Sequence, residues 1–176
     1  FNDDVSQSFL QLSKPTDKLI VINSASKSFN MTGWRIGWIT HPEELGPHIA
    51  KLVQITTTGV PEFLQNGLIS ALQNYKILTK EVRQNLKKSR DIMFQRLVEW
   101  KRVECSVPEA AFYAFFKVKD VKDSLEFAKK LIIDTNVGVA PGIAFGESGE
   151  GHLRICFAAQ ESFINDIMDR LEPALN

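Results

Sequence analysis

The amino-acid sequence predicts an α/β chain in which a partial α/β layer is followed by a small α+β domain. Three observations lead to this fold class. A short aliphatic run at residues 19–22 is typical of a strand in a partial parallel sheet, buried on both faces. A helical pattern then extends from about residue 77 to residue 100, and short strand patterns mixed with helical ones follow it. We therefore divide the chain into 1–76, a long helix at 77–100, and 101–176.

Composition excludes several classes of protein. The chain has 176 residues, of which 44% are hydrophobic and 24% charged, as in an ordinary globular domain. Twenty-one Lys and Arg balance 21 Asp and Glu, so no basic surface points to nucleic acid. The longest aliphatic run is far too short to span a membrane. Two cysteines, Cys105 and Cys156, are too few for a disulfide framework and lack CxxC spacing, and the three histidines lack metal-ligand spacing. We expect a cytoplasmic protein with no metal site and no nucleic-acid or membrane partner.

The first part begins with a polar, irregular segment at residues 1–18, before the Leu19–Ile22 strand. A second strand is predicted at Trp34–Ile39, where alternation places Arg35 and Gly37 on one face. The Thr40–Glu43 sequence fits a capping box that starts a helix ending near residue 56. Another helix is expected from residue 61 to about residue 74.

The second part begins after the long helix, whose apolar stripe comprises Leu78, Val82, Leu86, Met93 and Leu97. Its remaining elements are predicted from short patterns. They are strands at 102–105, 111–118 and 153–157, a strand and turn at 137–142, and helices at 124–133 and 161–171.

Lys27 is the first candidate for chemistry. It lies a few residues beyond a predicted strand, where open α/β sheets place their ligands, among the small and hydroxyl-bearing residues of 24–28. A lysine amine can form a Schiff base when its pKa is lowered, and a guanidinium such as that of Arg35 suits a phosphate. Taken alone, the two residues are better explained as a solvated loop lysine and an ordinary ion-pairing arginine.

Longer motifs decide between these interpretations. Residues 24–37 match the pattern S-x-S-K-x-F-x-x-x-G-x-R-x-G at every fixed position, and this string resembles the cofactor-lysine motif of class I/II (fold type I) pyridoxal-phosphate aminotransferases. Residues 108–113 resemble the family's P-x-G-A-F-Y stretch, with Ala110 where glycine is usual. Residues 139–146 are similar to its V-x-P-G-x-x-F-G loop, and residues 149–158 to its segment around a strand arginine. The likeness is to the C-terminal part of an aspartate aminotransferase-like chain.

The resemblance implies a fold and a set of roles. Residues 1–76 would be the last strands and helices of the cofactor-binding large domain, and 101–176 the small C-terminal domain. Lys27 would form the Schiff base with pyridoxal 5'-phosphate and serve as the base, while Ser24 and Arg35 would hold the cofactor phosphate. Arg154 would bind the substrate α-carboxylate. The alternative is a purely structural role, in which this strand arginine forms an ion pair with Glu147 or Glu150. The substrates implied are an amino acid and a 2-oxo acid, and the intact protein would be a homodimer in amino acid metabolism.

The resemblance also implies that a large part of the family's chain is absent. Family members are more than twice this length, and this chain begins at Phe1 without an initiator Met. We therefore expect a fragment with little or no aminotransferase activity of its own and with exposed apolar surface on its partial sheet. Two alternatives stay open: a pyridoxal-phosphate-dependent β-lyase or synthase of the same fold, and an aminotransferase-like effector domain of a transcription regulator. Tyr113 and Phe112 are interpreted as core aromatics of a strand.

Overall fold

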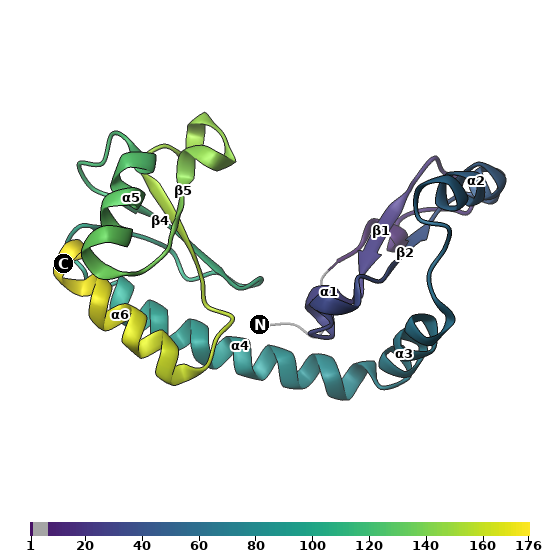
Figure 1. Cartoon of the computed structure of the whole chain (residues 1–176), viewed down its shortest axis with the longest axis horizontal. Coiled ribbons are helices and arrows are strands. Elements are labelled where there is room, and N and C mark those ends of the chain that lie inside the picture. The colour runs from purple at the N-terminus through teal and green to yellow at the C-terminus, as the bar shows by residue number, and fades with distance from the viewer. Residues whose placement is uncertain (2–6) are drawn as a thin grey trace. The chain divides into compact units, whose positions relative to one another are not determined.

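The computed structural model describes residue 1 and residues 7–176, so part of the irregular segment predicted at 1–18 lies outside the described residues. The chain forms two compact units (Figure 1). Unit 1 comprises Phe1–Asn2 and Gln84–Asn176, and unit 2 comprises Asp3–Arg83. The division falls inside the long helix α4 (Tyr75–Leu97). The domain limits at 76 and 100 stay predictions.

Unit 2 is built on a pair of antiparallel strands, β1 (Val21–Ser24) and β2 (Gly37–Thr40), whose register places Ser24 opposite Gly37. The short helix α1 and a 3-10 turn connect the two strands, and helices α2 and α3 follow. The bounds are η1 Phe9–Gln11, α1 Ala25–Ser28, η2 Thr32–Trp34, η3 Glu43–Leu45, α2 Gly46–Thr56 and α3 Glu62–Gln73.

The strand predictions for this unit are partly wrong. The pair is antiparallel and not parallel, and Ile22 is 76% exposed, so β1 is not buried on both faces. Arg35 is not in a strand, because its backbone is left-handed (φ 51°) and β2 begins only at Gly37. A Cβ on Gly37 would lie 2.3 Å from the carbonyl oxygen of Asn23. The residues before β2 therefore form a turn, and alternation cannot place Arg35 and Gly37 on one face.

The capping box predicted at Thr40–Glu43 is also wrong. Thr40 is the last residue of β2 and pairs with Val21, so it cannot serve as a helix N-cap. The segment after it first forms η3, and α2 begins at Gly46 with a proline in its first turn. A local sequence match was overridden by strand pairing with a residue far away in the sequence.

The core of unit 2 is small. Its buried apolar side chains come from α1, the connection to β2, and α3, and they are Ala25, Met31, Ile36, Leu68 and Ala71. Helix α2 buries none of its residues, and large apolar side chains on β1, β2 and α2 are exposed, including Ile22, Ile39, Leu52 and Ile55. The exposed apolar surface expected of a partial sheet is therefore present.

Unit 1 contains a four-stranded antiparallel sheet of order β3-β4-β6-β5. The strands are β3 (Val103–Glu104), β4 (Tyr113–Val118), β5 (Ala140–Pro141) and β6 (His152–Cys156). They are joined by α5 (Ser124–Thr135) and by the turns η4 (Gly142–Phe145) and η5 (Glu147–Gly149), and α6 (Glu161–Leu175) follows β6. Figure 1 shows α5 and α6 together with the end of α4 in this unit.

One face of this sheet forms the core of unit 1. Alternation along β4 and β6 buries Ala114, Phe116, Leu153 and Ile155, and these pack with apolar side chains of α4, α5 and α6. The alternate positions, which include Tyr113, Phe115, His152 and Arg154, are exposed or half-buried. The sheet thus presents a second face that carries aromatic and basic groups. No helix among the described residues is long and apolar enough to cross a membrane.

Candidate active site

The turn that carries Lys27 follows β1 directly. Ser24, the last residue of β1, is the N-cap of α1, and its Oγ accepts a hydrogen bond from the backbone N–H of Ser26 at 3.1 Å. Ala25 and Ser26 are buried, so the backbone of this turn is anchored in the unit. Lys27 is the third residue of α1, and it is exposed. The predicted position of Lys27 just beyond a strand is confirmed.

Arg35 lies on the segment that returns from this turn into β2. The backbone N–H of Ala25 donates to the carbonyl of Ile36 at 3.1 Å, which ties the start of α1 to the residue after Arg35. The Nη1 of Arg35 donates to the carbonyl of Thr32 at 3.1 Å, its one hydrogen bond within the described part of the chain. A guanidinium has five N–H donors, so Arg35 keeps donors for an anion. Ser24, Lys27 and Arg35 therefore belong to two bonded segments of unit 2.

Two glycines permit this arrangement. Gly37 faces β1 so closely that any side chain would meet the Asn23 carbonyl. A Cβ on Gly67 of α3 would lie 2.3 Å from Cζ3 of Trp34, so the indole ring packs directly on the α3 backbone. The turn of Arg35 is thus supported by β1 at one end and by α3 at the other.

Arg154 lies on β6 in unit 1, where it is paired with Phe115 and with Ala140 of the neighbouring strands. It is half-buried, and its Cζ lies 4.3 Å from the ring centroid of Tyr113 and 4.2 Å from that of Phe145. The alternative pairing with Glu147 or Glu150 is absent, since no ion pair within the described residues includes Arg154.

The carboxylate of Glu150 has other partners. Its Oε1 accepts hydrogen bonds from the backbone N–H groups of Ser124 at 2.6 Å and Gly151 at 2.8 Å. The hydrogen bond from Gly151, followed by those from the hydroxyl and the backbone of Ser124, lowers the pKa of Glu150. Glu150 therefore anchors the loop before β6, whereas Arg154 contacts the aromatic rings.

A row of rings continues from Arg154 along this face. Phe145 meets Phe115 edge-on, with centroids 6.0 Å apart, and Phe115 stacks on His152 at 4.9 Å. Tyr113 belongs to this row, so its interpretation as a core aromatic is wrong. Tyr113 and Lys117 alternate with the apolar residues Ala114, Phe116 and Val118, and this alternation could have indicated the face from the sequence.

The site residues thus belong to two units. Unit 2 brings together Ser24, Lys27 and Arg35, and unit 1 holds Arg154 with its aromatic neighbours. Among the residues that the structure describes, no group of three His, Cys, Asp or Glu side chains could hold a metal ion.

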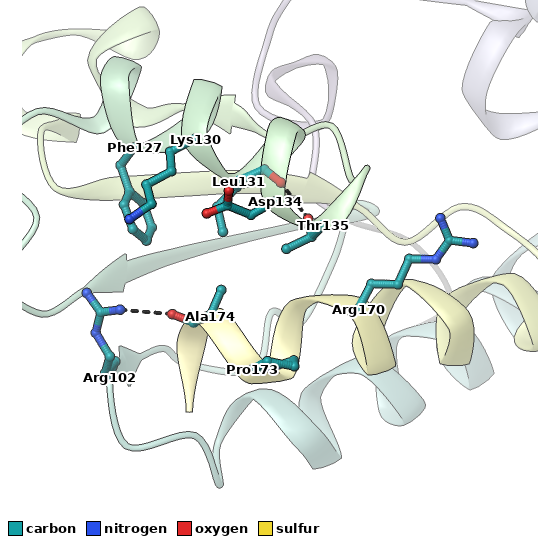
Figure 2. A pocket seen from close by; sticks show the side chains of 9 residues that line it. All are labelled: Arg102, Phe127, Lys130, Leu131, Asp134, Thr135, Arg170, Pro173 and Ala174. Carbon is teal, nitrogen blue, oxygen red and sulfur yellow. Dashed lines mark hydrogen bonds between the residues drawn. The ribbon is translucent and has the colours of Figure 1, made fainter.

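A separate pocket of about 430 Å³ in unit 1 contains none of these residues. Figure 2 shows it between α5 and the end of α6, with Phe127, Lys130 and Asp134 on its α5 side. Its two arginines already have partners: Arg102 donates to the carbonyl of Ala174 at 2.8 Å, and Arg170 pairs with Asp166 of α6 at 2.9 Å. Arg102 therefore has a structural role at the C-terminal end of α6, and Arg170 forms an ion pair within that helix.

The described residues thus present an exposed lysine after a strand, an arginine with unused donors, and a strand arginine in contact with rings, and these groups can bind anions. The family model described as Aminotransferase class I and II matches residues 2–171, and the chain belongs to this family. Its members are transferases that depend on pyridoxal 5'-phosphate. The predicted resemblance is confirmed, as is the α/β class.

Relatives of known sequence agree with the family. The chain is 32% identical to an aspartate aminotransferase of Pyrococcus abyssi over 177 residues, which cover 98% of this chain and 45% of that protein. It is 34% identical to a probable N-acetyl-LL-diaminopimelate aminotransferase of Bacillus subtilis, covering 89% of this chain and 40% of the relative. The chain thus spans less than half the length of these curated relatives.

Solved structures show the same relation. The aromatic aminotransferase from Pyrococcus horikoshii OT3 superposes with a TM-score of 0.89 and 30% identity, covering 98% of this chain and 47% of that one. The aspartate aminotransferase from Thermotoga maritima superposes with a TM-score of 0.84 and 30% identity, covering 98% and 44%.

Proposed function

We propose that this chain supplies part of the active site of a pyridoxal-phosphate-dependent aminotransferase, which moves an amino group between an amino acid and a 2-oxo acid. The observation that supports this most directly is that Ser24, Lys27 and Arg35 lie on two hydrogen-bonded segments, at the end of β1 and just before β2. In this proposal unit 2 corresponds to the end of the large cofactor-binding domain and unit 1 to the small C-terminal domain.

The residues of unit 2 fit the cofactor's chemistry. Ser24 offers an exposed hydroxyl, and Arg35 offers the remaining N–H groups of its guanidinium, so both could hold a phosphate. Lys27 would attach the cofactor covalently through its Nζ, as the Schiff base expected from the sequence requires. When bound, pyridoxal phosphate supplies an electron sink that makes the α-carbon of an amino acid acidic.

Lys27 has a second role in this proposal, as the base that removes the proton from the substrate Cα. The neutral nitrogen of a lysine amine can accept a proton. The segment that carries Arg35 is hydrogen-bonded to the turn of Lys27.

Arg154 would bind the α-carboxylate of the amino acid or 2-oxo acid. A guanidinium donates two parallel N–H bonds to a carboxylate, and its attachment to the central strand β6 fixes its direction. Lysine at this position would keep the charge and lose the two-point contact.

We also propose that the whole protein is a homodimer and that the chain alone has little or no activity. The chain covers 45% of its aspartate aminotransferase relative, and among the described residues the core that supports the turn of Lys27 has five buried apolar side chains. The named relatives support transamination over the lyase and regulator alternatives. The cytoplasmic location stays a prediction.

The cofactor role of Lys27 is tested by labelling. The full chain is incubated with pyridoxal phosphate, reduced with borohydride and mapped by peptide mass spectrometry. We expect one predominant adduct at Lys27, its loss in Lys27→Ala, and its retention in Lys51→Ala, a matched change at an exposed lysine of α2 in the same unit. Equal labelling of several lysines, unchanged by Lys27→Ala, would contradict the assignment.

A separate assay tests the activity of the chain alone. Purified chain is supplied with pyridoxal phosphate, 2-oxoglutarate and a panel of amino acids, and glutamate formation is measured. We expect no turnover above that of Lys27→Ala. Robust turnover that depends on Lys27 would overturn the proposal that the chain is inactive by itself and would support its assignment as an aminotransferase.

A further inference from the structure

We infer that Tyr113 and Phe145 are positioning residues, which hold the guanidinium of Arg154 by contact with their ring faces and leave its charge available to a carboxylate ligand. The identity of the ligand rests on the proposed function, whereas the role of the two rings rests on the geometry of unit 1. We refer to Tyr113 and Phe145 as the aromatic pair.

The contacts of the aromatic pair are close. The Cζ of Arg154 lies over both rings, at 4.3 Å from the Tyr113 centroid and 4.2 Å from the Phe145 centroid, within the range of about 6 Å in which a cation is attracted to a ring face. The N–H bonds of a guanidinium lie in its plane, while its faces stack on aromatic rings. Contact with rings can therefore restrain the group without using its donors.

The two rings come from different elements. Tyr113 is the first residue of β4, and Phe145 is the last residue of η4. Phe145 is further supported by the edge of Phe115, which is the β4 partner of Arg154. Four side chains from two strands and a turn, those of Tyr113, Phe115, Phe145 and Arg154, therefore restrain one another on this face of the sheet.

The turn that carries Phe145 is itself well anchored. The backbone N–H of Ile143 donates to Oγ of the buried Ser124 at 3.2 Å. A Cβ on Gly142 would lie 1.9 Å from the carbonyl oxygen of Gly149, so the backbones of η4 and η5 are in direct contact. The position of Phe145 is thus determined by the loop and does not depend on Arg154 alone.

The use of rings in place of carboxylates has a chemical consequence. Arg96 of α4 is held by Asp169 and Glu172 of α6, and those carboxylates neutralise its charge. Arg154 has no such ion pair within the described residues, and Glu150 is bonded to the backbone. A carboxylate partner would compete with a ligand carboxylate for the same donors, and a ring does not. The aromatic pair therefore restrains the guanidinium of Arg154 and leaves its N–H donors available to bind an anion.

The role of the pair is tested on the full chain by nuclear magnetic resonance of arginine Nε–Hε groups, with Arg154 assigned from its loss in Arg154→Lys. We expect restricted motion and an upfield ring-current shift for Arg154, both lost in Phe145→Leu and in Tyr113→Leu. Tyr113→Phe keeps the ring and should preserve both signals. Phe163→Leu, at an exposed aromatic residue of α6, is the matched control and should change neither.

A titration with pyruvate as the carboxylate probe gives the second measurement. We expect the Arg154 signal to shift on binding, and each leucine variant to weaken the apparent affinity by about three- to tenfold, as expected for the loss of one cation–ring contact. Tyr113→Phe should bind within about twofold of the unchanged chain.

The outcomes separate the inference from the function on which it builds. Unchanged motion and shift of Arg154 in both leucine variants would overturn the role of the aromatic pair. A second outcome is that both leucine variants lose the restricted motion and ring-current shift of Arg154, while the unchanged chain does not respond to pyruvate. This outcome would support the positioning role of the aromatic pair and overturn the carboxylate-binding role of Arg154. Phe145 is 46% exposed, so Phe145→Leu decides the question if Tyr113→Leu fails to fold.

Discussion

Substituting alanine for Gly142 tests whether the contact between η4 and η5 stabilises unit 1. A Cβ added at Gly142 would lie 1.9 Å from the carbonyl oxygen of Gly149 and 2.7 Å from that of His152. Ordinary carbon–oxygen contacts are about 3.3 Å or longer, so the two backbone segments would have to separate by roughly 1.4 Å. Neither obstacle is the end of a flexible side chain, and no rotamer change can relieve the overlap.

The cost follows from this overlap. Excess volume in a packed site typically destabilises by about 1–3 kcal/mol, and two rigid backbone obstacles place Gly142→Ala in the upper part of that range, at about 2–3 kcal/mol. In a unit of roughly one hundred residues, this corresponds to a fall of about 10–20 °C in the unfolding midpoint. We expect the free energy of unfolding of unit 1 to fall by that amount.

The assay is urea unfolding followed by the fluorescence of Trp100, which is buried in unit 1, in a background where Trp34 and Trp38 of unit 2 are replaced by phenylalanine. Gly138→Ala is the matched control, because a Cβ at Gly138 meets nothing within 4 Å and its φ is not left-handed. It should change stability by no more than about 0.5 kcal/mol. Equal stability of the two alanine variants would refute the reasoning.

Three further predictions concern other features of the chain. The pKa of Glu150 is lowered in the folded chain. The ionised carboxylate therefore stabilises the fold above the ordinary glutamate pKa, and this stabilisation is lost as pH falls through the lowered pKa. Glu150→Gln should therefore reduce the fall in the free energy of unfolding between pH 7 and pH 3, measured by urea unfolding. Burial raises the pKa of Cys105, whereas Cys156 is exposed, so iodoacetamide at pH 8 should modify Cys156 first, as read by mass spectrometry. Replacing Ile22 and Ile55, which are 76% and 80% exposed, by glutamate should reduce binding of the dye ANS and self-association in sedimentation, with a stability change within about 0.5 kcal/mol for each substitution.

Each of these predictions has a contrary outcome. Glu147→Gln, a change at an exposed glutamate of η5, should leave the acid profile as it is, and a profile unaltered by Glu150→Gln would contradict the anchoring role of Glu150. Faster modification of Cys105 would show that its thiol is accessible. Unchanged dye binding after both glutamate substitutions would mean that the apolar surface of β1 and α2 is not the source of the signal.

Local patterns predicted much of the secondary structure. The helices predicted at 61–74, 77–100, 124–133 and 161–171 correspond to α3, α4, α5 and α6, with differences of a few residues at most ends. These segments have regular apolar spacing over two or more turns, so their own residues determine the state of the chain. The predictions at Trp34–Ile39 and Thr40–Glu43 were wrong because pairing of β1 with β2 decides where β2 begins and ends.

The sequence by itself determined the family and the candidate chemistry. Residues 24–37 lie within one short stretch, and matching every fixed position of a motif requires no knowledge of the fold. The same stretch identified Ser24, Lys27 and Arg35, and the structure adds how the turn is anchored through Ala25 and Ile36.

Only the tertiary structure decided what surrounds Arg154. Tyr113 is far from Arg154 along the chain and Phe145 is on the loop before it, and nothing in either local sequence indicates that both rings contact one guanidinium. That arrangement depends on strand register, on the contact of Gly142 with Gly149, and on which sheet face the helices cover. Strand register and helix packing join segments that are distant in sequence, and such contacts form only when the whole core of the unit packs.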